Sequence, residues 1–188
     1  MKVMYFLAAL VIGFSLALDS PQTSNSSSSP VPDFSGAWQL DRKQSTNTES
    51  LRLPDITLVI SQRDSILNVT RTVKDKKKER VQELTYYMDG RGEKNPTLFG
   101  GEKRESKSSW SSSKLVSKYA LTSWSSGTNR YYIQPVTETW ELSKDGQILT
   151  MTAEVGEVKN ASEFFEREWF KPYKYRKVFK RIQWLEVK

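Results

Sequence analysis

Short segments in which apolar and polar residues alternate follow one another along most of this chain. Successive side chains of a β-strand point to opposite faces, so this alternation predicts strands with one apolar face. Residues 56–61 and 67–73 form such a pair, and the polar turn Arg63-Asp64-Ser65 between them predicts a β-hairpin. Other strands are predicted at 34–40, 79–88, 103–110, 115–121, 130–142, 148–155 and 173–183.

The remaining segments are predicted to connect these strands. Residues 41–54 show no alternation and predict a long first loop. Residues 91–101 and 123–128 are rich in loop-forming residues such as glycine, and residues 160–170 predict a short helix or an irregular segment. Strands that alternate with helices are absent from the pattern, which argues against a parallel sheet. The chain is therefore predicted to be all-β, with eight or nine antiparallel strands that either close into a barrel or form a sandwich.

The stretch Phe34-Ser35-Gly36-Ala37-Trp38-Gln39-Leu40 is the predicted first strand around which we organise the rest. Its odd and even positions fall on opposite faces, and Phe34, Gly36, Trp38 and Leu40 share one of them. Glycine inside a strand often marks a close approach of another group. We therefore expect Gly36 to leave space beside Trp38 in the core.

The N-terminal residues are expected to direct export. Lys2 precedes a short apolar run, and Ser15-Leu16-Ala17 supplies the small residues of a cleavage site, so residues 1–17 predict a signal peptide. An uncleaved anchor is the alternative, although the run is short for a membrane span of about 20 residues. Residues 18–32, rich in serine and proline, predict a flexible linker, and residues 33–188 the barrel domain. The expected location is secreted or periplasmic.

The amino-acid composition of the chain excludes several classes of chemistry. The chain of 188 residues has no cysteine and no histidine, which excludes disulfides, thiol nucleophiles, histidine-dependent triads and Cys/His metal sites. We expect no cofactor and no metal. The formal net charge is +7, with basic clusters at Lys76–Lys78 and at 171–181. In the second cluster, Lys174, Lys177 and Lys180 are expected on the outer wall of the barrel or at its rim. Because the leader sends the protein out of the cytoplasm, nucleic acid is not an expected partner, whereas an anionic envelope surface of polymers or lipids remains an alternative one.

Three segments resemble the calycins, and among them lipocalin-like secreted bacterial proteins: Phe34–Trp38, Leu84–Gly90 and Thr137–Gly146. The resemblance extends from Phe34 to Arg181 and implies an up-and-down β-barrel of about eight to nine strands. It also implies that an arginine of the last strand packs across the Trp38 indole at the closed end of the barrel. Gly36, Trp38 and Arg181 would form this structural signature, with Arg176 as a competing arginine.

Two charged residues occupy positions of apolar parity. Arg71 shares the parity of Leu67 and Val69, and Glu138 lies between Val136 and Trp140. If these faces point inward, both charges need partners, because an isolated buried charge is costly. Arg71 would then meet the carboxylate or phosphate of an amphiphile, as interior arginine and tyrosine do in the similar fatty-acid-binding calycins. The alternatives are a structural ion pair, or a one-residue shift in register that places Arg71 in water.

Several aromatic residues of the predicted strands either line a cavity or fill a solid core. The predicted ligand-binding residues are Arg71, Tyr86, Trp110, Tyr119, Tyr132, Glu138 and Trp140. The predicted function is non-catalytic binding of a small apolar or amphipathic ligand in the barrel. The alternatives are surface binding to anionic polymers or lipids, a purely structural role, and, as an enzyme, a carboxylate pair of Glu138 and Glu154. The ligand and the oligomeric state do not follow from the sequence.

Overall fold

The computed structural model describes residues 31–46, 54–76, 78–97, 103–159 and 170–183. The predicted signal peptide, nearly all of the predicted linker and almost all of the segment 160–170 lie outside these residues. The strands are β1 (Gly36–Leu40), β2 (Asp55–Arg63), β3 (Ile66–Asp75), β4 (Lys78–Tyr87), β5 (Glu93–Asn95), β6 (Arg104–Ser111), β7 (Lys114–Ser125), β8 (Arg130–Leu142), β9 (Ile148–Val155) and β10 (Tyr173–Ile182).

These strands form a single antiparallel sheet in the order β4-β3-β2-β1-β10-β9-β8-β7-β6-β5. The described residues thus contain ten strands, and the prediction of eight or nine was too low. The additional strand is β5, which has only three residues, Glu-Lys-Asn, and no apolar residue that alternation could reveal. The prediction of a loop at 123–128 was also wrong at its start, because β7 continues to Ser125 and pairs there with Arg130.

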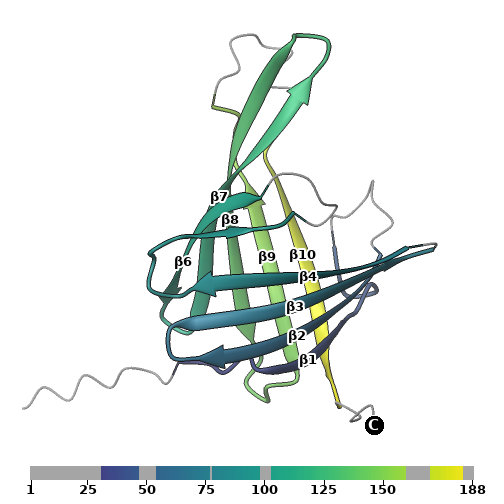
Figure 1. Cartoon of the computed structure of the whole chain (residues 1–188), viewed down its shortest axis with the longest axis vertical. Helices are drawn as coiled ribbons and strands as arrows, with labels where there is room; N and C mark the ends of the chain where they lie inside the picture. The colour runs from purple at the N-terminus through teal and green to yellow at the C-terminus, as the bar shows by residue number, and fades with distance from the viewer. Residues whose placement is uncertain (1–30, 47–53, 77, 98–102, 160–169, 184–188) are drawn as a thin grey trace, which may run out of the picture.

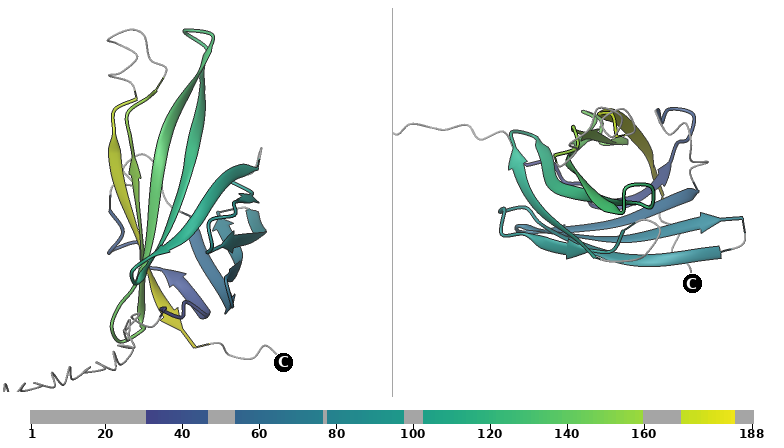
Figure 2. Two further views of the ribbon diagram at one scale, coloured as in Figure 1. Left: turned by 90° about the vertical axis from the view of Figure 1, so that its left-hand side faces the viewer. Right: turned by 90° about the horizontal axis from the view of Figure 1, so that it is seen from above.

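The sheet curls into a nearly closed barrel. In Figure 1, β1–β4 cross in front of β7–β10, and the view from above in Figure 2 shows the strands curving around an interior. The pairing of β1 with β10 joins the first and last strands of the sequence, with Trp38 opposite Arg181. The β7–β8 hairpin projects well beyond the front strands (Figures 1 and 2).

Side chains complete the barrel where β4 and β5 lie together without a backbone ladder. The Asn95 amide accepts a hydrogen bond from the Thr85 backbone N–H and donates one to the Thr85 carbonyl, both at 2.8 Å. The Glu93 carboxylate accepts from the Tyr87 backbone N–H at 3.3 Å. Glu93 and Asn95 are both buried, whereas Lys94 between them is exposed. The side chains therefore satisfy backbone groups that a strand would otherwise pair.

The interior contains two apolar clusters. The larger one surrounds Trp38 and Trp140, and it includes Leu115, Leu149 and Phe179. The smaller one consists of Tyr119, Val136, Ala153 and Val155, with Leu121 and Tyr175 packed against it. No helix that is long and apolar enough to cross a membrane occurs within the described ranges.

Arg181 covers Trp38 within the larger cluster. The guanidinium carbon Cζ lies 4.2 Å from the centre of the indole, and Arg181 donates to the carbonyls of Gly146 and Ser35 at 2.7 Å each. Gly36 has φ +131°, and a side chain there would collide with Arg181 Nη1. The competing Arg176 is exposed and donates to the Gln44 carbonyl at 3.0 Å. The contact expected for the last-strand arginine is therefore made by Arg181.

Candidate ligand-binding site in the barrel interior

A layer of polar side chains separates the two apolar clusters. On β7, Ser117 lies between Leu115 of the larger cluster and Tyr119 of the smaller one, and on β8 Glu138 lies between Trp140 and Val136. On β10, Lys177 lies between Phe179 and Tyr175. Because alternate residues of a strand share a face, all three side chains point into the barrel. Together with Arg71 and Arg104 we call them the polar belt.

The charged side chains of the belt interact with one another. The charge of Glu138 acts on Arg71, Arg104 and Lys177, which places this carboxylate among three cations. Its oxygens accept hydrogen bonds from Trp140 Nε1 at 2.7 Å and from the Tyr119 hydroxyl at 3.4 Å. Within the described residues, none of the three cations lies within 4.0 Å of a carboxylate oxygen. The positive charge of the belt is therefore only partly balanced.

Arg71 forms hydrogen bonds within the barrel wall in addition to its interaction with Glu138 in the interior. Its Nε and Nη2 donate to Gln82 Oε1 at 2.9 and 2.7 Å, and Nη2 also donates to the Pro96 carbonyl at 3.2 Å. Gln82 in turn donates to the Thr97 carbonyl at 2.7 Å. These bonds link β3 and β4 to the segment after β5. Burial lowers the pKa of Arg71.

Arg104 is less fully bonded. Its Cζ lies 3.5 Å from the centre of the Tyr119 ring, a close cation–π contact. In the described part of the chain, its buried Nε has no hydrogen-bond partner, and neither has the buried Ser117 Oγ. A buried donor without a partner costs about 1–3 kcal/mol, so these two groups are available to bind a ligand or a water molecule.

The expectation that Lys177 lies with Lys174 and Lys180 on the outer wall or its rim was wrong. Lys177 lies on the inward face of β10, between Tyr175 and Phe179. Burial lowers the Lys177 pKa; Glu138 opposes this effect, while Arg71 and Arg104 add to it. Its Nζ lies 5.1 Å from the centre of the Tyr175 ring. Lys174 and Lys180 instead make outer ion pairs with Glu154 and Asp41, both at 2.7 Å.

Tyrosine hydroxyls complete the surroundings of the belt. Burial raises the pKa of Tyr86 and of Tyr119, and it raises that of Tyr175 to about 12. The nearby Glu138 carboxylate acts in the same direction on all three. These hydroxyls thus stay protonated near neutral pH and remain able to donate hydrogen bonds to an anion.

The predicted ligand-binding residues separate into three groups. Arg71, Tyr86, Tyr119 and Glu138 come together at the belt. Trp110 and Trp140 pack into the larger cluster, where the Phe34 and Trp110 rings are 5.5 Å apart, although Trp140 also donates to Glu138. Tyr132 lies elsewhere, stacked on Phe170 at 4.5 Å and bonded to Thr128.

Sequence reasoning missed Arg104, Ser117, Lys177 and Tyr175 as site residues. Lys177 could have been found, because it shares the parity of Tyr175 and Phe179. Arg104 gave no such signal, since its own inward row continues with serines at 106 and 108. The carboxylate pair considered for catalysis is not formed, because Glu154 is exposed and bound to Lys174.

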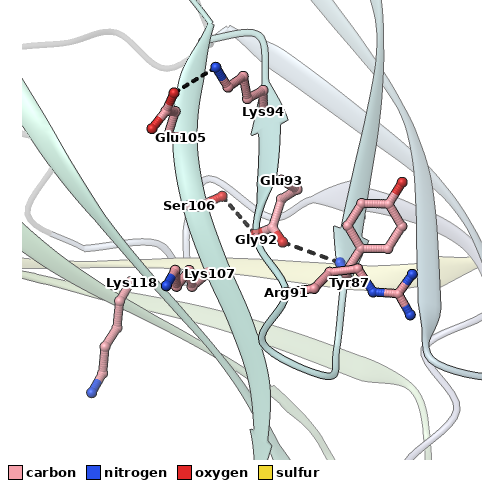
Figure 3. A pocket seen from close by; sticks show the side chains of 9 residues that line it. All are labelled: Tyr87, Arg91, Gly92, Glu93, Lys94, Glu105, Ser106, Lys107 and Lys118. Carbon is pink, nitrogen blue, oxygen red and sulfur yellow. Dashed lines mark hydrogen bonds and ion pairs between the residues drawn. The ribbon is translucent and has the colours of Figure 1, made fainter.

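A separate groove of about 580 Å³ lies on the outside of the barrel (Figure 3). It is lined by Tyr87, Arg91, Gly92, Glu93, Lys94, Glu105, Ser106, Lys107 and Lys118. Most of its charges are engaged: Lys94 pairs with Glu105 at 2.7 Å, Arg91 pairs with Asp89, and Glu93 accepts from Ser106 at 2.7 Å. The interior belt, with its unbalanced charge, is therefore the stronger candidate site. Among the described residues, no group of three or more acidic side chains is placed to hold a metal ion.

The single, nearly closed antiparallel sheet defines a calycin-type β-barrel. A similar solved structure is the REP1-NXSQ fatty acid transporter, with a TM-score of 0.52 and 12% identity over 80% of this chain and 97% of that one. A fatty acid-binding protein from brain tissue of Drosophila melanogaster is 17% identical over 79% and 99% of the two chains, with a TM-score of 0.45. No family model and no curated protein matches the sequence.

Proposed function

We propose that this protein binds an amphipathic molecule, with the apolar part inside the barrel and an anionic head group at the polar belt. The observation that carries this proposal is the excess of cations that face the barrel interior, since among the described residues Arg71, Arg104 and Lys177 interact with one carboxylate, that of Glu138. An anion among them would lower the cost of burying the cations. The apolar clusters on both sides of the belt suit an alkyl chain. A similar fold in a protein named a fatty acid transporter agrees with this assignment.

The proposed role is binding rather than catalysis, and the proposed setting is extracytoplasmic. Export rests on the sequence of residues 1–17 alone. Mass spectrometry of the exported protein should find a mature N-terminus near Leu18, and an intact Met1 in a membrane fraction would contradict export.

Replacing Arg104 with glutamine should weaken binding of laurate about 10–100-fold, because a hydrogen bond to a charged group contributes about 1.5–3 kcal/mol. Dodecanol, which has the same chain length without the charge, should bind the variant as it binds the native protein. The matched control is Lys107→Gln, whose side chain lies on the outer face of the same strand. Calorimetric titration measures the affinities of the native protein and of both variants for the two ligands. Equal laurate binding by Arg104→Gln and the native protein would contradict the proposed role of the belt.

A second candidate function is docking on an anionic lipid surface through the end of the β7–β8 hairpin. Trp124 and Tyr131 are 51% and 61% exposed, and their rings lie 4.7 Å apart. Residues 106–137 contain four lysines and arginines and no acidic residue. Exposed tryptophan and tyrosine favour the membrane interface, and basic residues favour anionic lipids.

Trp124→Ser should lower partitioning onto phosphatidylserine-containing vesicles about tenfold, because burying a large apolar side chain contributes about 1.5–3 kcal/mol. Val81→Ser is the control, since Val81 is 60% exposed on β4, away from the hairpin end. Vesicle co-sedimentation at low and high salt measures the effect, and binding should weaken with salt. Partitioning that is equally strong onto zwitterionic vesicles, or unchanged in Trp124→Ser, would rule out this docking surface.

A further inference from the structure

The net charge of the polar belt bears on the kind of head group it accepts. Three cations, Arg71, Arg104 and Lys177, interact with the single carboxylate of Glu138, which leaves an excess of two positive charges. Another buried carboxylate, Glu93, is not one of the belt residues and accepts its hydrogen bonds from neutral donors, Ser106, Ser108 and the Tyr87 N–H, so among the described residues no cation of the belt pairs with it. A head group with one negative charge would therefore leave one excess charge buried in the barrel, where charge is costly.

The hydrogen-bonding groups of the belt point to the same conclusion. Arginine and lysine side chains donate hydrogen bonds and accept none. Arg104 Nε and Ser117 Oγ are buried without a hydrogen-bond partner among the described residues, and Lys177 Nζ lies over a tyrosine ring instead of against a carboxylate. A carboxylate offers two oxygens, whereas a phosphate monoester offers three strong acceptor oxygens that match guanidinium donors.

We propose that the head group bound at the belt is a dianion of the phosphate monoester type, so that the preferred ligands are single-chain alkyl or acyl phosphates. This inference rests on the proposed function, because it specifies the ligand class of the same site. The dianion would bring the charge of the belt with its ligand to zero. It would also give Arg104, Ser117 and Lys177 the acceptors that they lack in the protein alone.

The test compares two ligands that have the same shape and differ in charge. Dodecyl phosphate passes from one to two negative charges as its second proton is lost near a pKa of about 6, whereas dodecyl sulfate keeps one charge throughout. Their affinities for the full chain are measured by calorimetry at pH 5 and pH 8, below the concentrations at which they form micelles. The titratable groups at and around the belt are Arg71, Arg104, Lys177, Glu138, Tyr86, Tyr119 and Tyr175. They act on either head group, so the ratio of the two affinities cancels their common effects.

The phosphate should bind at least about tenfold more tightly than the sulfate at pH 8, because an added charge among close cations is worth more than about 1.4 kcal/mol. At pH 5 the two affinities should be similar. Lys177→Met removes one cation and should reduce the ratio at pH 8, and the native ratio tests the proposal even if this variant does not fold.

The possible outcomes separate the two proposals. If sulfate or laurate binds and the ratio is near one at both pH values, the proposed dianion specificity is wrong while binding in the barrel stands. If dodecyl phosphate, dodecyl sulfate and laurate all fail to bind, the proposed function is wrong as well. A ratio that is high at pH 8 and falls to near one at pH 5 supports both.

Discussion

Replacing Trp38 with alanine should lower the free energy of unfolding by about 3–5 kcal/mol, the usual cost of removing a large aromatic side chain from a core. Trp38 is fully buried in the larger cluster, so the change leaves a cavity that the rigid barrel wall cannot fill. The Phe34 carbonyl also loses the hydrogen bond that Trp38 Nε1 donates at 2.9 Å. Arg181 loses the ring under its guanidinium, a contact worth about 0.5–2 kcal/mol.

Urea denaturation followed by far-UV circular dichroism measures this change. The control is Trp124→Ala, because Trp124 is 51% exposed and its removal should change stability by only about 0.5 kcal/mol. A loss below about 1 kcal/mol for Trp38→Ala would mean that the junction of the first and last strands is not central to the stability of the barrel.

Replacing Glu138 with glutamine should have two opposite effects, a loss of stability and a gain in anion affinity. Glutamine has nearly the same shape but removes the carboxylate that interacts with all three belt cations. The change also weakens the hydrogen bonds that Trp140 Nε1 and the Tyr119 hydroxyl donate to this charged group, and hydrogen bonds of this kind typically contribute about 1.5–3 kcal/mol. An anionic ligand would then replace the missing charge, so laurate should bind at least about tenfold more tightly than it binds the native protein.

A loss of stability together with a gain in laurate affinity distinguishes a binding site from a purely structural network. Thermal unfolding with and without laurate measures both effects, because a ligand that binds the folded state raises its stability. Glu141→Gln is the matched control, since Glu141 lies on the outer face of the same strand in an exposed ion pair with Lys114. Lower stability of Glu138→Gln without a gain in laurate affinity would indicate that the belt is purely structural.

Much of the barrel could be predicted from local patterns. Alternation located most of the ten strands, because a strand with one buried face imposes a period of two on its own residues. The same parity placed Arg71 and Glu138 on the predicted inward faces, where Glu138 is buried and Arg71 is half-buried. The contact of Arg181 with Trp38 followed from the resemblance to calycins, together with the positions of the two residues in the first and last strands.

The short strand β5 and the belt depended on contacts between distant segments. Glu93 and Asn95 are buried because they satisfy backbone groups of β4, and nothing in their own polar sequence indicates burial. The parity of a residue indicates on which face of the sheet its side chain lies, but not which side chains of other strands lie next to it.

The sequence by itself determined which side chains of a strand share a face, since alternation is a property of each strand alone. Only the tertiary structure decided which of these side chains meet. The meeting of Arg71, Arg104, Glu138 and Lys177 depends on how their four strands are staggered around the barrel. The stagger is set by the closure of the whole sheet, which no single strand encodes.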